Sequence, residues 1–140
     1  MIFSKNQTFS DAQAVTATAA STNIIDTGAF GTPHGGNALA RDLGKGTPIP
    51  FLAQVTVDFA TLTSLKFSLQ CDDNSGFSSP KTVVEQTIAL ADLKAGKQVA
   101  FQVLPNDITE RYVRMYYTVA GSNATAGKVT AGVTMGNQTN

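Results

Sequence analysis

The stretch ERYVRMYYTVAGSNATAGKVTAGVTMG, residues 110–136, decides the fold class of this 140-residue chain. Its first part alternates apolar and polar side chains, which is the pattern of a half-buried β-strand. One face of that strand carries residues suited to a core, namely Val113, Met115, Tyr117 and Val119. The opposite face carries an aromatic and basic row, made of Tyr112, Arg114, Tyr116 and Thr118.

We predict a β-hairpin over this stretch, with paired strands at 111–120 and 128–135 and the segment GSNATAG as the connecting loop. A register centred on Ala124 sets apolar residues against apolar residues across the two strands. The predicted pairs are Val119–Val129, Tyr117–Ala131, Met115–Val133 and Val113–Met135. A slip of one residue would turn these side chains to the wrong face, so the pattern favours this register.

The same register offers an explanation for the aromatic and basic row. Tyr116 would lie opposite Gly132 and Tyr112 opposite Gly136, so that each ring covers backbone that a glycine leaves exposed. Arg114 could stack on either ring, for ~0.5–1 kcal/mol at an exposed site. Tyrosine and arginine are also enriched at binding hot spots. We therefore interpret Tyr112, Arg114 and Tyr116 both as a self-stabilising surface and as a candidate contact with a partner.

Other short strands with turn signals between them follow the same all-β pattern. They are expected at 51–58, 62–71, 81–90 and 98–104, with thinner strands at 12–22 and 23–26. Helical periodicity is nearly absent, and the segment ALADLKAG at 89–96 has room for about one turn. About eight strands in a single domain over residues 1–140 predict a jelly-roll-like sandwich of two sheets.

Two segments fall outside this strand pattern. Residues 28–50 hold six glycines and three prolines, and a loop of this length in a compact domain is commonly functional. Residues 1–12 are a possible N-terminal arm that carries apolar side chains among polar ones. Burial of these apolar residues is the expected mode of attachment to a partner: Ile2, Phe3 and Phe9 in the arm, and Phe30 and Leu39 in the loop.

Composition excludes several classes of function. Charged residues make up only 14% of the chain, and ten basic residues balance ten acidic ones. No basic patch is available to release counterions from nucleic acid phosphates. No apolar run is long enough to cross a membrane, and the N-terminus lacks the pattern of a signal peptide. We expect neither nucleic acid nor a membrane as a partner.

The inventory of reactive side chains argues against an enzyme. His34 is the only histidine and Cys71 the only cysteine, so a nucleophile with its base or a four-ligand zinc site has too few residues. The segment DDNSG at 72–76 lacks the glutamate that a calcium loop needs at position twelve, so we predict a turn. We expect no catalytic residue, metal or cofactor. A carbohydrate-binding module is the more serious alternative, with Tyr112 and Tyr116 as its platform.

Four stretches together resemble the capsid cement proteins of tailed phages. They are residues 1–28, the segment SLKFSLQCDDNSGFSSP at 64–80, the segment IALADLKAG at 88–96, and the opening stretch 110–136. The resemblance implies a jelly roll without catalytic activity or cofactor. It implies a homodimer at two-fold positions on the outside of an HK97-like head, where the protein ties neighbouring major capsid proteins together non-covalently. The protein would be made in the host cytoplasm and end up in the virion.

Overall fold

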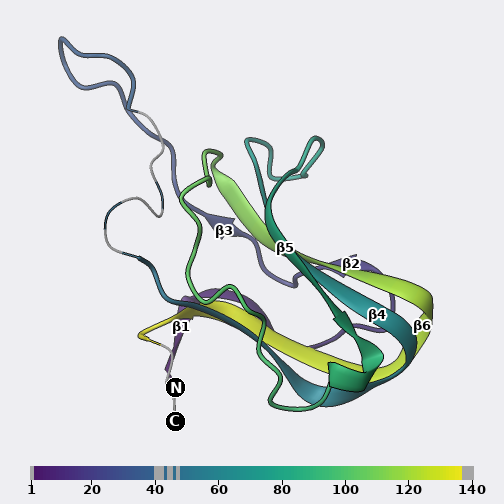
Figure 1. Cartoon of the computed structure of the whole chain (residues 1–140). Helices are drawn as coiled ribbons and strands as arrows, with labels where there is room; N and C mark the ends of the chain where they lie inside the picture. Colours follow the sequence, from purple (N-terminus) through teal and green to yellow (C-terminus); the bar gives the residue numbers. More distant parts are fainter. Residues whose placement is uncertain (1, 40–42, 44–45, 47, 137–140) are drawn as a thin grey trace.

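A computed structural model describes residues 2–39, 43, 46 and 48–136 of the chain, and its fold class is all-β, as predicted (Figure 1). Six strands form one antiparallel sheet. They are β1 (Phe3–Ala14), β2 (Ala19–Ala20), β3 (Ile25–Asp26), β4 (Phe51–Asp72), β5 (Lys81–Ala89) and β6 (Tyr112–Thr134). The helical structure in the described part is a single 3₁₀ turn, η1 (Leu90–Asp92), inside the segment where one turn was expected.

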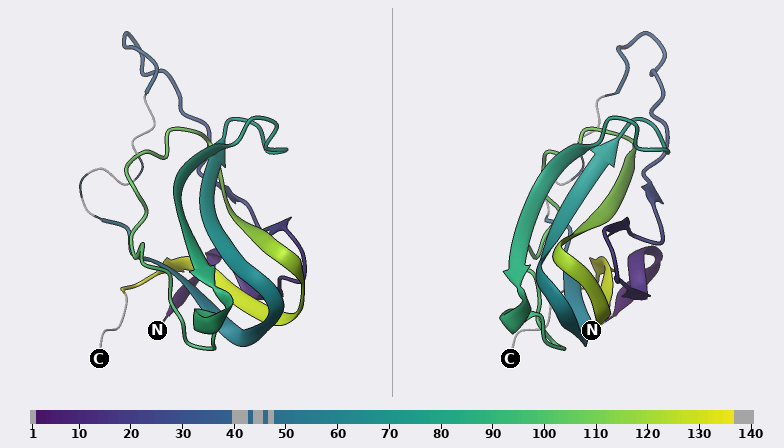
Figure 2. Two further views of the ribbon diagram at one scale, coloured as in Figure 1. Left: turned by 45° about the vertical axis from the view of Figure 1, so that its right-hand side comes forward. Right: turned by 90° about the vertical axis from the view of Figure 1, so that its right-hand side faces the viewer.

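The two longest strands, β4 and β6, pair antiparallel from one end to the other. Regular pairing is interrupted by register shifts between Val55 and Ser64, and such bulges bend a strand and increase its twist. Figures 1 and 2 show both strands curving sharply at this point. The sheet therefore folds over on itself, and its two halves form the layers of a sandwich around one core.

The segments that flank β4 and β6, residues 3–26 and 81–104, follow the same bend. Residues 3–26 run beside β6, because β1 pairs with its second half while β2 and β3 pair with its first half. On the other side, β5 pairs with the second half of β4. The segment 97–104 accompanies the first half of β4 through backbone hydrogen bonds such as Val99 N to Ala53 O at 3.0 Å. The expected short strands are thus parts of four long extended segments, 3–26, 51–72, 81–104 and 112–134. Within the third of these, the expected strand at 98–104 forms only isolated bridges.

The predicted hairpin between 111–120 and 128–135 is wrong, because both segments belong to the continuous strand β6. Tyr116 pairs with Ser68 of β4, and Gly132 lies between Leu52 of β4 and Thr8 of β1. The alternation of apolar residues was assigned to the correct face over most of β6, although Met135 just past its end is exposed, since alternation constrains which side chains point inward. It does not reveal which strand lies alongside, and the chain bends where a turn was expected.

Small and polar residues make the bend possible. Gly127 has a φ of 135°, and a side chain there would overlap the ring of Phe59. Thr61, with a φ of 75°, donates from its hydroxyl to the carbonyl of Asn123 at 2.7 Å. The same hydroxyl accepts from the amide of Thr125 at 3.1 Å. The segment GSNATAG therefore serves as a corner of the long strand, held against the corner of β4.

The N-terminal arm expected over residues 1–12 is also corrected by the structure. From Phe3 onward these residues form β1, paired with β6. Phe9 is fully buried and meets the ring of Phe51 edge to face, with the ring centroids 5.9 Å apart. Phe9 is thus a core residue rather than a contact with a partner, because its ring fills the space between the layers.

Tyr117 joins the two layers through its buried hydroxyl. Its ring packs edge to face on Phe67, and its oxygen lies 2.7 Å from Oγ of Ser10 on β1. Since the Ser10 hydroxyl donates to Oε1 of Gln13 at 2.7 Å, the tyrosine is the donor to Ser10. The side chain of Gln13 also accepts from the amide of Thr22. One chain of hydrogen bonds therefore links the core to the N-terminal run.

We predict that Gly132→Val destabilises the protein by about 1–3 kcal/mol, the usual range for overpacking. A Cβ atom at Gly132 would lie 3.0 Å from the carbonyl oxygen of Gln7 and 3.0 Å from Cα of Thr8, which are backbone atoms. Gly31→Val is the matched control, since nothing lies within 4 Å of a Cβ atom there. Urea unfolding measures both, and equal stabilities would contradict the close packing of β1 on β6.

We predict that Tyr117→Phe removes part of the alkaline sensitivity of the fold. Burial raises the pKa of Tyr117 above its ordinary value of 10.0. The unfolded chain ionises at the ordinary value, so the stability from this group is complete below pH 10 and is lost as pH rises further. The variant loses about 1 kcal/mol at neutral pH through the missing hydrogen bond. The free energy of unfolding should decrease less between pH 8 and pH 11 in the variant than in the wild type. An equal decrease in both proteins would refute the prediction.

Candidate partner-binding surfaces

The aromatic and basic row lies on the outer face of β6, where the sequence placed it. Tyr112, Arg114 and Tyr116 are half-buried, while the intervening Val113 and Met115 are buried. The Arg114 guanidinium lies 5.0 Å from the centroid of the Tyr116 ring, so the predicted stacking occurs on one of the two tyrosines. The row therefore stabilises its own surface, but through neighbours different from the predicted glycines.

The closest ring to Arg114 belongs to Phe77, which the sequence analysis did not single out. The guanidinium lies 4.1 Å from the centroid of that ring, and its Nε donates to Oε1 of Gln70 at 3.0 Å. Phe77 comes from the loop after β4, has a φ of 51° and is only 6% exposed. The loop thus folds back over β4 and β6 and covers part of the row.

Asp72 shapes this loop, and the predicted turn at 72–76 is confirmed. Its two carboxylate oxygens accept from the amides of Asn74 and Ser79, each at 2.9 Å. These bonds lower the pKa of Asp72, because they favour the charged carboxylate. The neighbouring Asp73 shares a hydrogen bond with Asp72, which raises the pKa of Asp73. An aromatic residue directly after an Asp-Asn turn was the signal in the sequence for a loop that packs back.

Arginines cover the faces of both tyrosines in the row. The Arg111 guanidinium lies 5.0 Å from the centroid of the Tyr112 ring, as Arg114 does for Tyr116. A sugar platform needs an open aromatic face, so this arrangement does not favour the carbohydrate-binding alternative.

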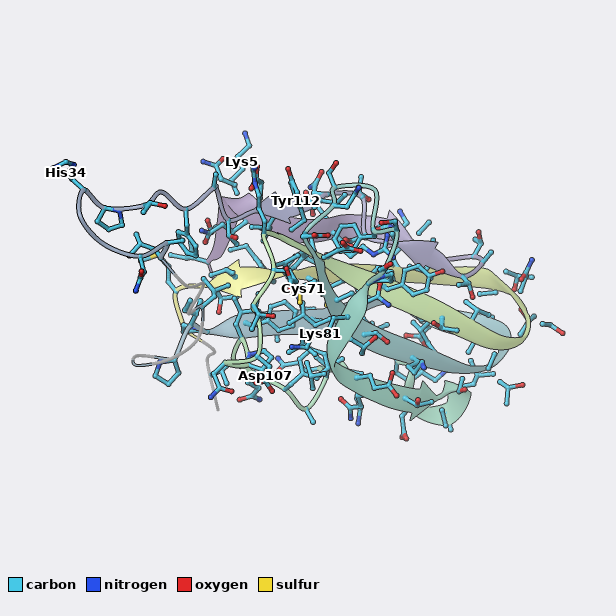
Figure 3. All side chains as sticks on the ribbon, turned by 90° about the horizontal axis from the view of Figure 1, so that it is seen from above. Lys5, His34, Cys71, Lys81, Asp107 and Tyr112 are labelled. Atoms are coloured by element: carbon cyan, nitrogen blue, oxygen red, sulfur yellow. The ribbon has the colours of Figure 1, made fainter. Side chains whose placement is uncertain are left out.

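A projecting loop, residues 28–39, extends away from the rest of the molecule (Figures 1 and 2). A turn closes its far end, with the Gly36 amide bonded to the carbonyl of Pro33 at 3.0 Å. The side chains of Phe30 and Leu39 are 47% and 55% exposed. His34 lies at the tip, far from the buried Cys71 (Figure 3). Part of the long loop predicted at 28–50 lies outside the described residues, but these two apolar side chains are presented to solvent.

The base of the projecting loop is fastened to the segment before β6. Nε and Nη2 of Arg111 donate to the two carboxylate oxygens of Asp26, each at 2.7 Å, and this pairing raises the pKa of Arg111. The amide and the hydroxyl of Thr27 donate to the Arg111 carbonyl at 3.0 and 2.7 Å. On the returning chain, Leu43 forms a β-bridge with Ile108.

A second exposed apolar site lies where β1 begins and β6 ends. Ile2 is 65% exposed and Met135 is 81% exposed. The Met135 amide donates to the Ile2 carbonyl at 3.1 Å, so these two residues are neighbours at the ends of adjacent strands. Of the expected arm residues, Ile2 is thus available at the surface, Phe3 is half-buried, and Phe9 is in the core. The hairpin register had assigned Met135 to the core.

The described residues include a small apolar cavity in the core. A cavity of about 60 Å³ lies between β1, β3 and the returning chain, with mainly apolar walls that include Phe9, Ile25, Leu43 and Leu104. Within the part of the chain that the structure describes, no three residues among His, Cys, Asp and Glu are grouped as metal ligands. The same residues contain no helix long and apolar enough to span a membrane.

We predict that Phe77→Ala destabilises the protein by about 2–4 kcal/mol, because it empties a buried site and removes the ring beneath Arg114. Phe30→Ala is the matched control, since its ring is 47% exposed, and its loss should stay below about 1 kcal/mol. Thermal and urea unfolding compare the two. If Phe77→Ala is no worse than Phe30→Ala, the loop after β4 is not docked on the sheet.

Comparison with known proteins gives one family. A family model described as Bbp16 matches residues 9–133, which is nearly the whole described chain from β1 to β6. No curated protein matches the chain.

Proposed function

The chain belongs to the Bbp16 family, which is phage-related, and from this premise we propose that it is a structural cement of a phage head. It binds the outer surface of an HK97-like shell and ties neighbouring major capsid proteins together without covalent bonds. It acts as a homodimer at two-fold positions. The function involves no catalytic step and no cofactor. The match over residues 9–133 carries the proposal, together with the resemblance of four sequence stretches to capsid cement proteins.

The architecture suits this role because it combines a rigid body with an extension. The four antiparallel runs around one core give the body, and the projecting loop extends beyond it. Phe30 and Leu39 are the contacts we assign to the shell, and Ile2 with Met135 forms a second candidate contact. Full burial of an exposed Phe or Leu is worth about 1.5–3 kcal/mol, so one loop supplies only a few kcal/mol.

Such weak contacts become sufficient through repetition. When one half of a dimer is docked, the other half is held near its own site, and avidity can exceed a single affinity by about 10²–10⁴-fold. A two-fold dimer also requires a self-complementary interface. The low charge content and zero net charge of the chain are compatible with such an association, since little repulsion opposes it.

We predict that the purified chain binds isolated heads formed by the major capsid protein encoded with it, measured by co-sedimentation. Phe30→Ser combined with Leu39→Ser should weaken binding at least about tenfold, because two apolar contacts are lost. Val57→Ser is the control, since Val57 is 43% exposed but lies at the bend of β4. The fold should be unaffected in all three proteins, as checked by circular dichroism.

Two results would count against the proposal. If the wild-type chain stays in the supernatant with heads but binds members of a glycan array, the protein is a carbohydrate-binding module. If sedimentation velocity shows a strict monomer at high concentration, the two-fold dimer is wrong even where shell binding is observed.

A further inference from the structure

The chain before the projecting loop and the chain after it both contact one short stretch, residues 108–111, directly before β6. The outgoing end is held through Asp26 and Thr27, which bond to Arg111. Leu43, which follows the loop in the sequence, forms a β-bridge with Ile108. The loop therefore leaves the body from a fixed base, and its described residues extend away from the body in Figures 1 and 2.

The pairing of Asp26 with Arg111 is the most specific of these attachments. Its two parallel N–H···O bonds, each 2.7 Å long, are the bidentate geometry that only a planar guanidinium provides. The Gly28 amide donates to Oδ1 of the same carboxylate at 2.8 Å, so the carboxylate also orients the first residue of the loop. The two side chains remain 44% and 39% exposed.

Exposed ion pairs of this kind contribute little to global stability, about 0–1 kcal/mol. A second pair in the molecule allows comparison: Lys66 and Glu85, 3.1 Å apart and 37% and 51% exposed, lie on β4 and β5 away from the loop. The Asp26 pair differs because it joins β3, the loop and the segment before β6. Its effect is thus expected on the direction of the loop rather than on the fold.

We propose that Arg111 is a positioning residue for partner binding, which holds Asp26 and thereby directs the projecting loop so that Phe30 and Leu39 meet the partner in a pre-set orientation. The inference rests on the proposed function, in which the partner is the phage shell. A loop fixed before binding loses less conformational freedom on docking, so a weak apolar contact yields more affinity. Arg111 also covers Tyr112, so one side chain connects the loop to the row on β6.

The test uses the full chain with three changes at the pair. Asp26→Asn removes the charge, Arg111→Lys keeps the charge but removes the bidentate geometry, and the double variant Asp26→Arg with Arg111→Asp restores the pair in reverse. Glu85→Gln, which breaks the comparison pair, is the matched control. Co-sedimentation with isolated heads gives the dissociation constant, ¹⁵N relaxation gives order parameters for residues 29–39, and the melting temperature reports on the fold.

Both single changes should raise the dissociation constant about tenfold and lower the loop order parameters toward the flexible range below about 0.6. The reversed pair should recover part of both losses, because it restores the ion pair but not the bond from the Gly28 amide, while Glu85→Gln changes neither. The melting temperatures should stay within a few degrees of the wild type. This combination separates positioning from a structural role, since a structural role would lower the melting temperature.

The inference is overturned if wild-type chain binds heads and Asp26→Asn binds them equally well, or if the loop order parameters do not change when the pair is broken. Failure of the proposed function has a different signature. In that case the wild-type chain does not bind heads at all, while the order parameters still decide whether the pair directs the loop.

Discussion

The pairing of β4 with β6 is the constraint on which the rest of the structure depends. These strands lie side by side from Phe51 and Val133 at one end to Asp72 and Tyr112 at the other. Every other run is added to one of their outer edges, and all runs bend at the same place. The two layers are therefore not independent sheets that associate, because each long strand contributes to both. Residues at the bend, such as Gly127 and Thr61, matter to the whole core for this reason.

The sequence predicted a large part of the fold because its signals are local. Alternation placed Val113, Met115 and Tyr117 in the core, and the structure has all three buried. The Asp-Asn turn after β4 and the single helical turn near residue 90 also lie where they were expected. Each of these predictions depends on residues within a few positions of one another.

The failures share a different cause, since they concern partners distant in the sequence. A bend and a turn can have the same composition, and GSNATAG became the corner of β6 because β4 lies beside it with a matching irregularity. Phe9 was assigned to a surface arm, whereas pairing with β6 carries it into the core. The contact of Phe77 with Arg114 depends on the positive φ of Phe77, a backbone conformation that a phenylalanine does not predict. Among the candidate contacts, only exposure in three dimensions separated Phe30, Leu39 and Ile2 from Phe9.

The antiparallel ladder between β4 and β6 also determines how the molecule bears force. A pull along these strands loads many backbone hydrogen bonds in shear at the same time, so that no single bond carries the tension alone. A pull across the strands would instead open the ladder one pair after another. Each layer should thus be mechanically strong along its own strands and weak across them. The resistance of the protein on a surface under tension would depend on how those strands are oriented.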